Sequence, residues 1–214
     1  MIRRVLEKFW NKKEKEPDIT EQTVFDEIEE MFNSLGDNEI KILLGEDLQE
    51  FRDEIGNKIK TLRSEIKEEC GFILPPVNIQ THDNLQENEY KISVNGKVIF
   101  YDFIIPTEEN ALKEIIKGLK NSFHENVADF FTNEITERYA CAVQKNNGWL
   151  AWNVTGSMPI TSLKAILIDL LENKQPINNI IDIFERINEE IFSNPTPAWT
   201  RDPHEISQKI LQTF

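Results

Sequence analysis

The fold of this chain is decided by residues 90–101, which read YKISVNGKVIFY. Two runs in which apolar and polar residues alternate are joined there by Asn95-Gly96. An Asn-Gly pair between such runs favours a two-residue hairpin turn, because both turn positions need a positive φ. The stretch therefore predicts two antiparallel strands.

Upstream of this hairpin, the sequence predicts a strand, a long helix and an irregular strand. Residues 39–44 alternate loosely between apolar and polar side chains, and a helix then runs over about residues 46–70. Gly71 is placed to cap this helix. Pro75-Pro76 makes the strand over residues 73–79 irregular or confines it to an edge. The helix has one apolar face, formed by Leu48, Phe51, Ile55, Ile59, Leu62 and Ile66.

Downstream of the hairpin, apolar residues return at helical spacing from Glu108 onward. Two later helices are predicted: residues 163–172, capped by Ser162, and residues 177–191, which start near Pro176. Prolines make residues 194–204 an extended tail before a short helix over residues 205–214. A further helix over residues 20–34 precedes the first strand. The fold class is therefore α+β, a small mixed sheet with packed helices followed by a mostly helical part.

The chain is expected to divide into three parts. These are an amphipathic arm or linker over residues 1–19, an α/β subdomain over residues 20–106 and a helical subdomain over residues 107–214. The arm carries an apolar stripe beside basic residues, and the stripe contains Ile2, Leu6, Phe9 and Trp10. Such an arm docks on a partner protein or on an anionic membrane surface, or it is a terminus with a few apolar side chains.

The composition is that of an acidic globular protein. Its 214 residues include 24 Lys plus Arg and 38 Asp plus Glu, which gives a formal net charge of -14. Phosphate backbones would be repelled, so nucleic acid is not an expected partner. No apolar stretch approaches the ~20 residues that cross a bilayer, and no secretory signal is visible, so we expect a cytoplasmic protein. Cys70 and Cys141 are expected to be reduced, mostly buried thiols.

The sequence contains no pattern that predicts catalysis, a cofactor or a metal site. G-x-S-x-G, P-loop and G-x-G-x-x-G motifs are absent. His82, His124 and His204 do not have the spacing of metal ligands. Trp149 and Trp152 are neighbouring aromatic residues on a predicted loop, where they either anchor a partner or, as we expect, pack in the core. Trp199, in the tail, is equally compatible with a partner contact and with burial.

Several short motifs occur in a fixed order along the chain. They are GEDL at residues 45–48, GFILPPVNI at 71–79, DNL at 83–85, NEYKI at 88–92, NGKV at 95–98 and a helical block over 160–191. In this order and spacing they resemble the cytoplasmic domain of the flagellar and type III secretion export-gate (FHIPEP) family. The resemblance runs with gaps from Glu39 to Phe214, and it departs from the family pattern at Gln80-Thr81-His82.

The resemblance implies a scaffold without catalysis of its own. In that family the domain forms a ring beneath a membrane channel and receives chaperone–substrate complexes. Carried over to this chain, the resemblance implies partner-binding residues and, in the arm, residues that contact a neighbouring copy. The partner-binding residues are Glu69, Phe72, Asp102 and Phe103, and the self-association residues are Ile2, Leu6, Phe9 and Trp10. A core position is the alternative for Phe72.

The sequence lacks the family's membrane half and the small subdomain that usually follows residues 101–105, so we do not expect a complete export gate. The leading hypothesis is a protein-binding and assembly module that docks chaperone-like or membrane-complex proteins. One alternative is an adaptor in an unrelated phage or defence system. A second alternative is a small acid/base hydrolase that uses His82 and nearby acidic residues.

Overall fold

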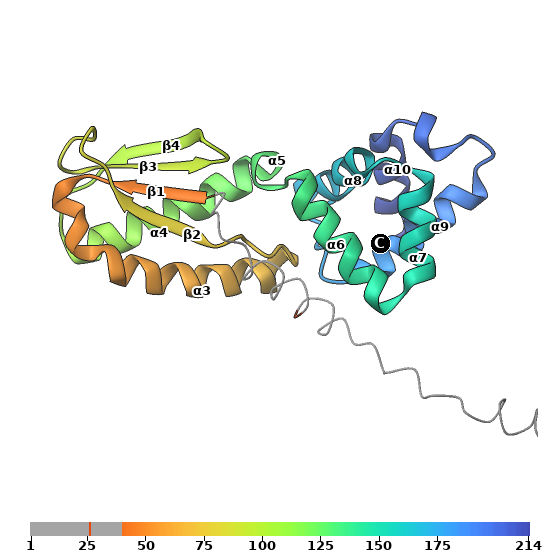
Figure 1. Cartoon of the computed structure of the whole chain (residues 1–214), viewed down its shortest axis with the longest axis horizontal. Helices are drawn as coiled ribbons and strands as arrows, with labels where there is room; N and C mark the ends of the chain where they lie inside the picture. Colours follow the sequence, from red (N-terminus) through yellow and green to blue (C-terminus); the bar gives the residue numbers. More distant parts are fainter. Residues whose placement is uncertain (1–25, 27–39) are drawn as a thin grey trace, which may run out of the picture.

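The computed structural model describes Asp26 and residues 40–214. The predicted arm and, apart from Asp26, the predicted helix over residues 20–34 lie outside the described residues. The described part forms two lobes side by side, an α/β lobe and a helical lobe (Figure 1). Buried side chains of both lobes belong to one continuous hydrophobic core.

The α/β lobe contains a four-stranded mixed sheet in the order β2-β1-β3-β4. Its strands are β1 (Ile40–Leu44), β2 (Val77–Thr81), β3 (Glu89–Val94) and β4 (Lys97–Phe103). β1 pairs parallel with β2 and antiparallel with β3, and β3 and β4 form the predicted hairpin. Asn95 and Gly96 take φ values of 51° and 79°, as this turn requires. β2 begins directly after Pro76 and is an edge strand, as the two prolines predicted.

Two helices, α3 (Arg52–Cys70) and α4 (Glu108–Glu125), cover one face of the sheet (Figure 1). The 3-10 helix η1 (Glu46–Phe51) precedes α3, so the helix predicted over residues 46–70 starts with a tighter turn. The apolar face of α3 is buried as predicted. α4 approaches the sheet closely at Gly118, where an added Cβ would lie 2.6 Å from the hydroxyl oxygen of Tyr90. That hydroxyl donates a hydrogen bond to the Glu114 carbonyl at 3.1 Å.

The short helix α5 (Val127–Phe130) leads into the helical lobe. This lobe contains α6 (Asn133–Asn146), α7 (Gly148–Ser157), α8 (Ile160–Glu172), α9 (Ile180–Ser193) and α10 (Pro203–Leu211). The α+β fold class is thereby confirmed. Because α4 packs on the sheet, we propose that the two lobes divide at α5, whereas the sequence placed the boundary at residue 106.

Two predicted helix starts were wrong. α8 begins at Ile160 after Pro159, and Ser162 lies in its first turn with its N–H bonded to the Pro159 carbonyl at 2.9 Å. The fixed φ of a proline, -66° here, is already suitable for entering a helix. α9 begins at Ile180, later than the predicted start near Pro176. The N–H of Ile177 is bonded outside the helix, to the Cys70 carbonyl at 2.8 Å. Asn179 caps α9 instead, accepting a hydrogen bond from the Asp182 N–H.

The predicted extended tail also differs from the structure. A 3-10 turn, η2 (Ala198–Thr200), interrupts residues 194–204. The last helix starts at Pro203, two residues earlier than predicted, because Asp202 accepts a hydrogen bond from the His204 N–H and Pro203 occupies the first turn.

The two lobes are joined at the end of α3 by a junction of buried hydrogen bonds around Gly71. The hydroxyl of Tyr139 on α6 donates to the Gly71 carbonyl at 3.0 Å and accepts from the Ile73 N–H at 3.0 Å. Gly71 has a φ of 73°, and an added Cβ would lie 2.3 Å from the backbone nitrogen of Asn178. Only glycine therefore fits at this position without movement of the chain.

Replacing Tyr139 with Phe tests this junction. We expect Tyr139→Phe to lower the free energy of unfolding by about 2 to 4 kcal/mol, because one buried carbonyl and one buried N–H lose their partner. Urea denaturation measures the change. Tyr101→Phe is the matched control, since Tyr101 is 62% exposed, and it should change stability by less than about 0.5 kcal/mol. Equal effects of the two substitutions would contradict the junction.

An ionic cluster holds the C-terminal helix α10 to α8. His204 Nδ1 lies 2.9 Å from Asp169 Oδ2, and the Ser207 hydroxyl donates to the same carboxylate oxygen at 2.5 Å. The hydrogen bond and charge of Asp169 raise the pKa of His204 above its usual value. Protonated His204 therefore stabilises the attachment of α10.

The pH dependence of this attachment follows from the raised pKa. The contribution is fully present below the pKa of His204 in the unfolded chain, and it is lost as pH rises through the higher pKa of the folded state. We expect the stability difference between wild type and His204→Gln to shrink from about pH 6 to about pH 8. His82→Gln, in an exposed loop, serves as the control. A pH-independent difference for His204→Gln would show that the Asp169 contact carries no charge effect.

Candidate partner-binding surfaces

Glu69 lies near the C-terminal end of α3, where the two lobes meet. Its carboxylate pairs with Lys120 Nζ at 3.0 Å and with His124 Nε2 at 3.6 Å, both on α4. The side chain remains 48% exposed. With residues at the ends of α4 and α8, Glu69 lines a hollow of about 350 Å³. A cationic group of a partner could compete here with Lys120 for the carboxylate.

Phe72 is fully buried, three residues from Glu69. Its ring stacks on Phe123 at a centroid distance of 5.0 Å and lies 5.3 Å from the ring of Phe131. The ring thus belongs to the core, which was the alternative for this position. Near Phe72, the exposed carboxylate of Glu69 is the group that a partner can contact.

Asp102 and Phe103 lie together at the end of β4, and both are exposed. Asp102 Oδ1 accepts a hydrogen bond from the Phe103 N–H at 2.8 Å. Phe103 pairs with Glu89 and Asp102 with Tyr90 across the hairpin, so the two side chains leave opposite faces of the sheet. The structure therefore separates Asp102 and Phe103 from Glu69 into a second surface, on the outermost strand of the sheet.

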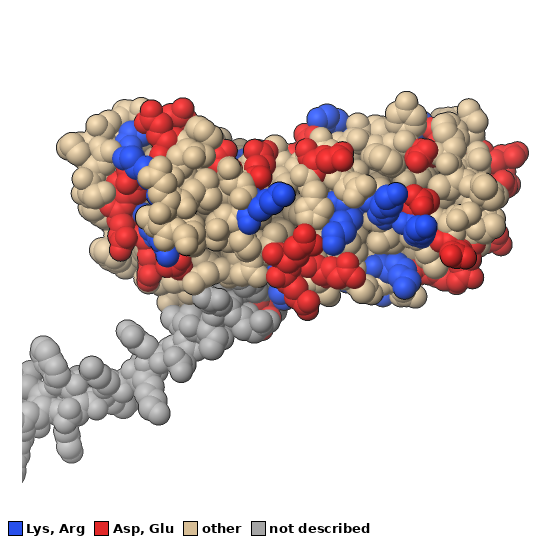
Figure 2. Space-filling view, turned by 180° about the vertical axis from the view of Figure 1, so that it is seen from behind, with Lys and Arg blue, Asp and Glu red and all other residues tan. Residues whose placement is uncertain are grey.

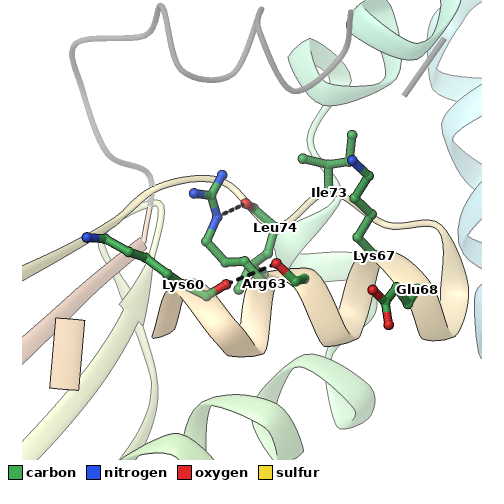
Figure 3. Close-up of a pocket in the computed structure, with 7 residues that line it drawn as sticks. Lys60, Arg63, Lys67, Glu68, Ile73 and Leu74 are labelled. Carbon is green, nitrogen blue, oxygen red and sulfur yellow. Dashed lines mark hydrogen bonds between the residues drawn. The ribbon is translucent and has the colours of Figure 1, made fainter. Parts of the chain in front are cut away.

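A basic groove on α3 was not found by the sequence reasoning. Lys60, Arg63 and Lys67 border a hollow of about 390 Å³ beside Ile73 and Leu74 (Figure 3). Arg63 Nε donates to the Leu74 carbonyl at 2.8 Å, which ties the residues after α3 to the helix. The signal was present in the sequence, since these cations are spaced for one helix face.

The exposed tryptophans correct a second prediction. Trp149 and Trp152 lie on helix α7 instead of a loop, and they are 66% and 70% exposed instead of buried. The apolar contacts of α7 with the core are made by its other face, through Leu150, Ala151 and Val154. Trp199 is 65% exposed, so burial of this residue is also excluded.

His82 lies in the exposed loop after β2. Its Nδ1 accepts a hydrogen bond from the Asn84 N–H at 3.3 Å, so the imidazole supports a local turn. No feature of this loop favours the hydrolase hypothesis. Among Asp26 and residues 40–214, no group of three His, Cys, Asp or Glu side chains is arranged to hold a metal ion.

The two cysteines differ in their surroundings. Cys70 is partly buried and donates its S–H to the Ile66 carbonyl at 3.2 Å, and burial raises the pKa of its thiol to about 11. Cys141 is exposed on α6, which corrects the prediction that both thiols are mostly buried.

This difference predicts two rates of thiol modification. At about pH 8, only ~0.1% of Cys70 is thiolate, so a thiol-specific disulfide reagent should label Cys141 quickly and Cys70 much more slowly. Absorbance during labelling measures both phases. Cys141→Ser should remove the fast phase and Cys70→Ser the slow one. Two phases of equal rate would contradict the burial of Cys70.

Comparison with known proteins identifies the family of this chain. Residues 2–115, more than half of the chain, match the FHIPEP family model. The chain therefore belongs to the FHIPEP family. It matches none of the curated proteins by sequence.

Among Asp26 and residues 40–214, no single helix is long and apolar enough to cross a membrane, although α7 and α8 pass that test together as a pair bent by 104°.

Solved structures share the fold. The Chlamydia pneumoniae CdsV protein is 16% identical with a TM-score of 0.66, covering 81% of this chain and 65% of its own. The complex of the Chlamydia pneumoniae CdsV and CdsO proteins gives 16% identity and a TM-score of 0.65, covering 81% and 64%. The nonameric EscV cytosolic domain from the type III secretion system gives 15% identity and a TM-score of 0.57, covering 82% and 63%. This chain thus spans about two thirds of the length of these structures.

Proposed function

We propose that this chain is a non-enzymatic protein-binding and assembly module of the kind found in the cytoplasmic domain of a type III or flagellar export gate. The family match over residues 2–115 carries the proposal. Two structures with the same fold support it, one in a complex with another protein, CdsO, and one nonameric. The module works in the cytoplasm.

Partner docking uses the two surfaces that the fold presents. Glu69 offers a half-exposed carboxylate at the hollow between the lobes. Asp102 and Phe103 offer a carboxylate and an apolar ring at the edge of the sheet. A partner with cationic and apolar side chains complements both surfaces, which fits a protein whose net charge is -14.

Self-association uses the arm, through Ile2, Leu6, Phe9 and Trp10, which lie outside the described residues. The arm combines apolar side chains with Arg3, Arg4 and Lys8, whereas the chain as a whole is acidic. A basic arm is attracted to the acidic surface of a neighbouring copy, and its apolar stripe would be buried in the contact.

Deleting residues 1–18 tests the assembly part of the proposal. We expect the full chain to sediment as an oligomer and the shortened chain to sediment at a smaller mass, because the apolar stripe is lost. Analytical ultracentrifugation at several concentrations measures the mass, and circular dichroism checks that the remainder is folded. Phe9→Ser with Trp10→Ser in the full chain is the second variant, with Trp152→Ser, on the helical lobe, as the control. An unchanged mass in the deletion and in the double variant would sink the assembly proposal.

A further inference from the structure

Among the residues that the structure describes, one edge of β4 has no partner strand. The strand order β2-β1-β3-β4 places it at the end of the sheet, where it pairs only with β3 among the described elements. An edge strand presents a row of N–H and C=O groups to solvent, and a second strand can bind to such a row. β2, at the opposite edge, is preceded by two prolines, which limit pairing there.

The exposed residues of β4 are unusually apolar. Val98, Tyr101 and Phe103 are 49%, 62% and 45% exposed. They pair with Ser93, Lys91 and Glu89, which places them on the face of the sheet that α3 and α4 do not cover. On the same face, β1 carries Lys41 and the half-buried Leu43, and β2 carries Asn78 and Gln80. The exposed apolar side chains of this face therefore gather on the edge strand, where a partner strand would extend them.

The geometry of the ladder also leaves room for a partner. A bulge interrupts the pairing of β3 and β4 between Ile92 and Ser93. Bulges protect edges, but this one lies near the turn. Beyond it, four consecutive residues of β4 from Phe100 to Phe103 pair regularly with β3. Four residues give a strand of about 13 Å, enough for a short extended peptide.

The opposite face at this end of the sheet is acidic. Asp102 shares a face with Tyr90, whose hydroxyl contacts α4, so its exposed carboxylate lies on the side where that helix packs. Glu108 and Glu109 follow Asp102 after β4 and are exposed in the first turn of α4. Glu87 is exposed in the loop before β3. The Ile104 N–H donates a hydrogen bond to the Asn88 carbonyl of this loop at 3.1 Å. Figure 2 shows acidic side chains along the outer end of the α/β lobe.

We propose that β4 binds an extended segment of a partner protein by strand addition, and that this segment alternates apolar with basic residues. The apolar residues lie beside Tyr101 and Phe103, and the basic residues lie on the other face beside Asp102. In the free chain Asp102 Oδ1 accepts a hydrogen bond from the Phe103 N–H, and the bound strand replaces this contact. The alternation follows from the strand itself, because successive side chains point to opposite faces. The inference rests on the proposed docking function and specifies its binding mode and the chemistry of the partner.

A synthetic octapeptide in which valine alternates with lysine is the probe, and the full chain is the receptor. We expect calorimetry to show binding that is at least about tenfold weaker for one of two peptides, the first methylated at the valine nitrogens and the second at the lysine nitrogens, because only one of these alternating sets donates hydrogen bonds to β4. A peptide that alternates valine with glutamate should bind at least about tenfold more weakly as well, because Asp102 and its acidic neighbours repel it. Hydrogen exchange should slow at residues 100–103 when the first peptide binds.

Protein variants separate this site from general attraction to an acidic surface. Tyr101→Lys with Phe103→Lys, and separately Asp102→Lys, should weaken binding of the valine–lysine peptide about tenfold or more. Trp149→Lys with Trp152→Lys changes two exposed aromatic residues and adds the same two charges on the other lobe, so binding should change less than about twofold.

Any of three binding results would overturn the inference. They are equal binding of every methylated peptide, equal weakening by Trp149→Lys with Trp152→Lys, and unchanged exchange in β4. A fall in sedimenting mass for Tyr101→Lys with Phe103→Lys would show that a second copy occupies the edge, which also overturns it. A peptide that does not bind while the full chain still assembles through its arm removes strand addition but leaves the proposed module intact. The effect of arm deletion on assembly tests the proposed function and does not test strand addition.

Discussion

The structure depends on the hydrogen bonds that close around Gly71. At this point α3 must end, the chain must turn towards β2, and the helical lobe must be held. A left-handed glycine allows the turn, and the hydroxyl of Tyr139 satisfies one carbonyl and one N–H that would otherwise be buried without a partner. The N–H of Ile177 satisfies the Cys70 carbonyl from the other side. The helical lobe therefore completes the end of a helix that belongs to the α/β lobe.

The candidate surfaces follow from this constraint. Glu69 lies two residues before Gly71, so the junction fixes its distance to Lys120 and His124 and shapes the hollow beside it. The same turn directs the chain through Pro75 and Pro76 into β2, which leaves β4 as the outermost strand at the other side of the sheet. One surface thus lies at the seam between the lobes and the other at the far edge, and neither blocks the other.

Local signals in the sequence were enough to predict the sheet and its neighbours. Asn95-Gly96, the apolar face of α3 and the cap at Gly71 each depend on residues close in sequence, and the structure confirms them. Contacts between residues that are far apart in the sequence could not be predicted from it. The start of α9 differs from the prediction because Ile177 bonds to Cys70. The burial of Phe72 depends on Phe123 of α4 and on Phe131, which lies between α5 and α6. The exposure of Trp149 and Trp152 likewise depends on which face of α7 meets the lobe. The candidate site was thus predicted as residue positions, without the packing that decides which of them a partner can reach.

The span of the junction along the chain also affects synthesis. The hairpin can form as soon as its own residues leave the ribosome, because its turn joins adjacent positions. The contact between Asn178 and Glu68 spans 110 residues, and the bond between Tyr139 and Ile73 spans 66. A nascent chain therefore leaves the Gly71 carbonyl and the Ile73 N–H without the Tyr139 hydroxyl until α6 has been translated. The time between these events is when a chaperone would bind the newborn protein, and a chain that stops before α6 would never complete the junction.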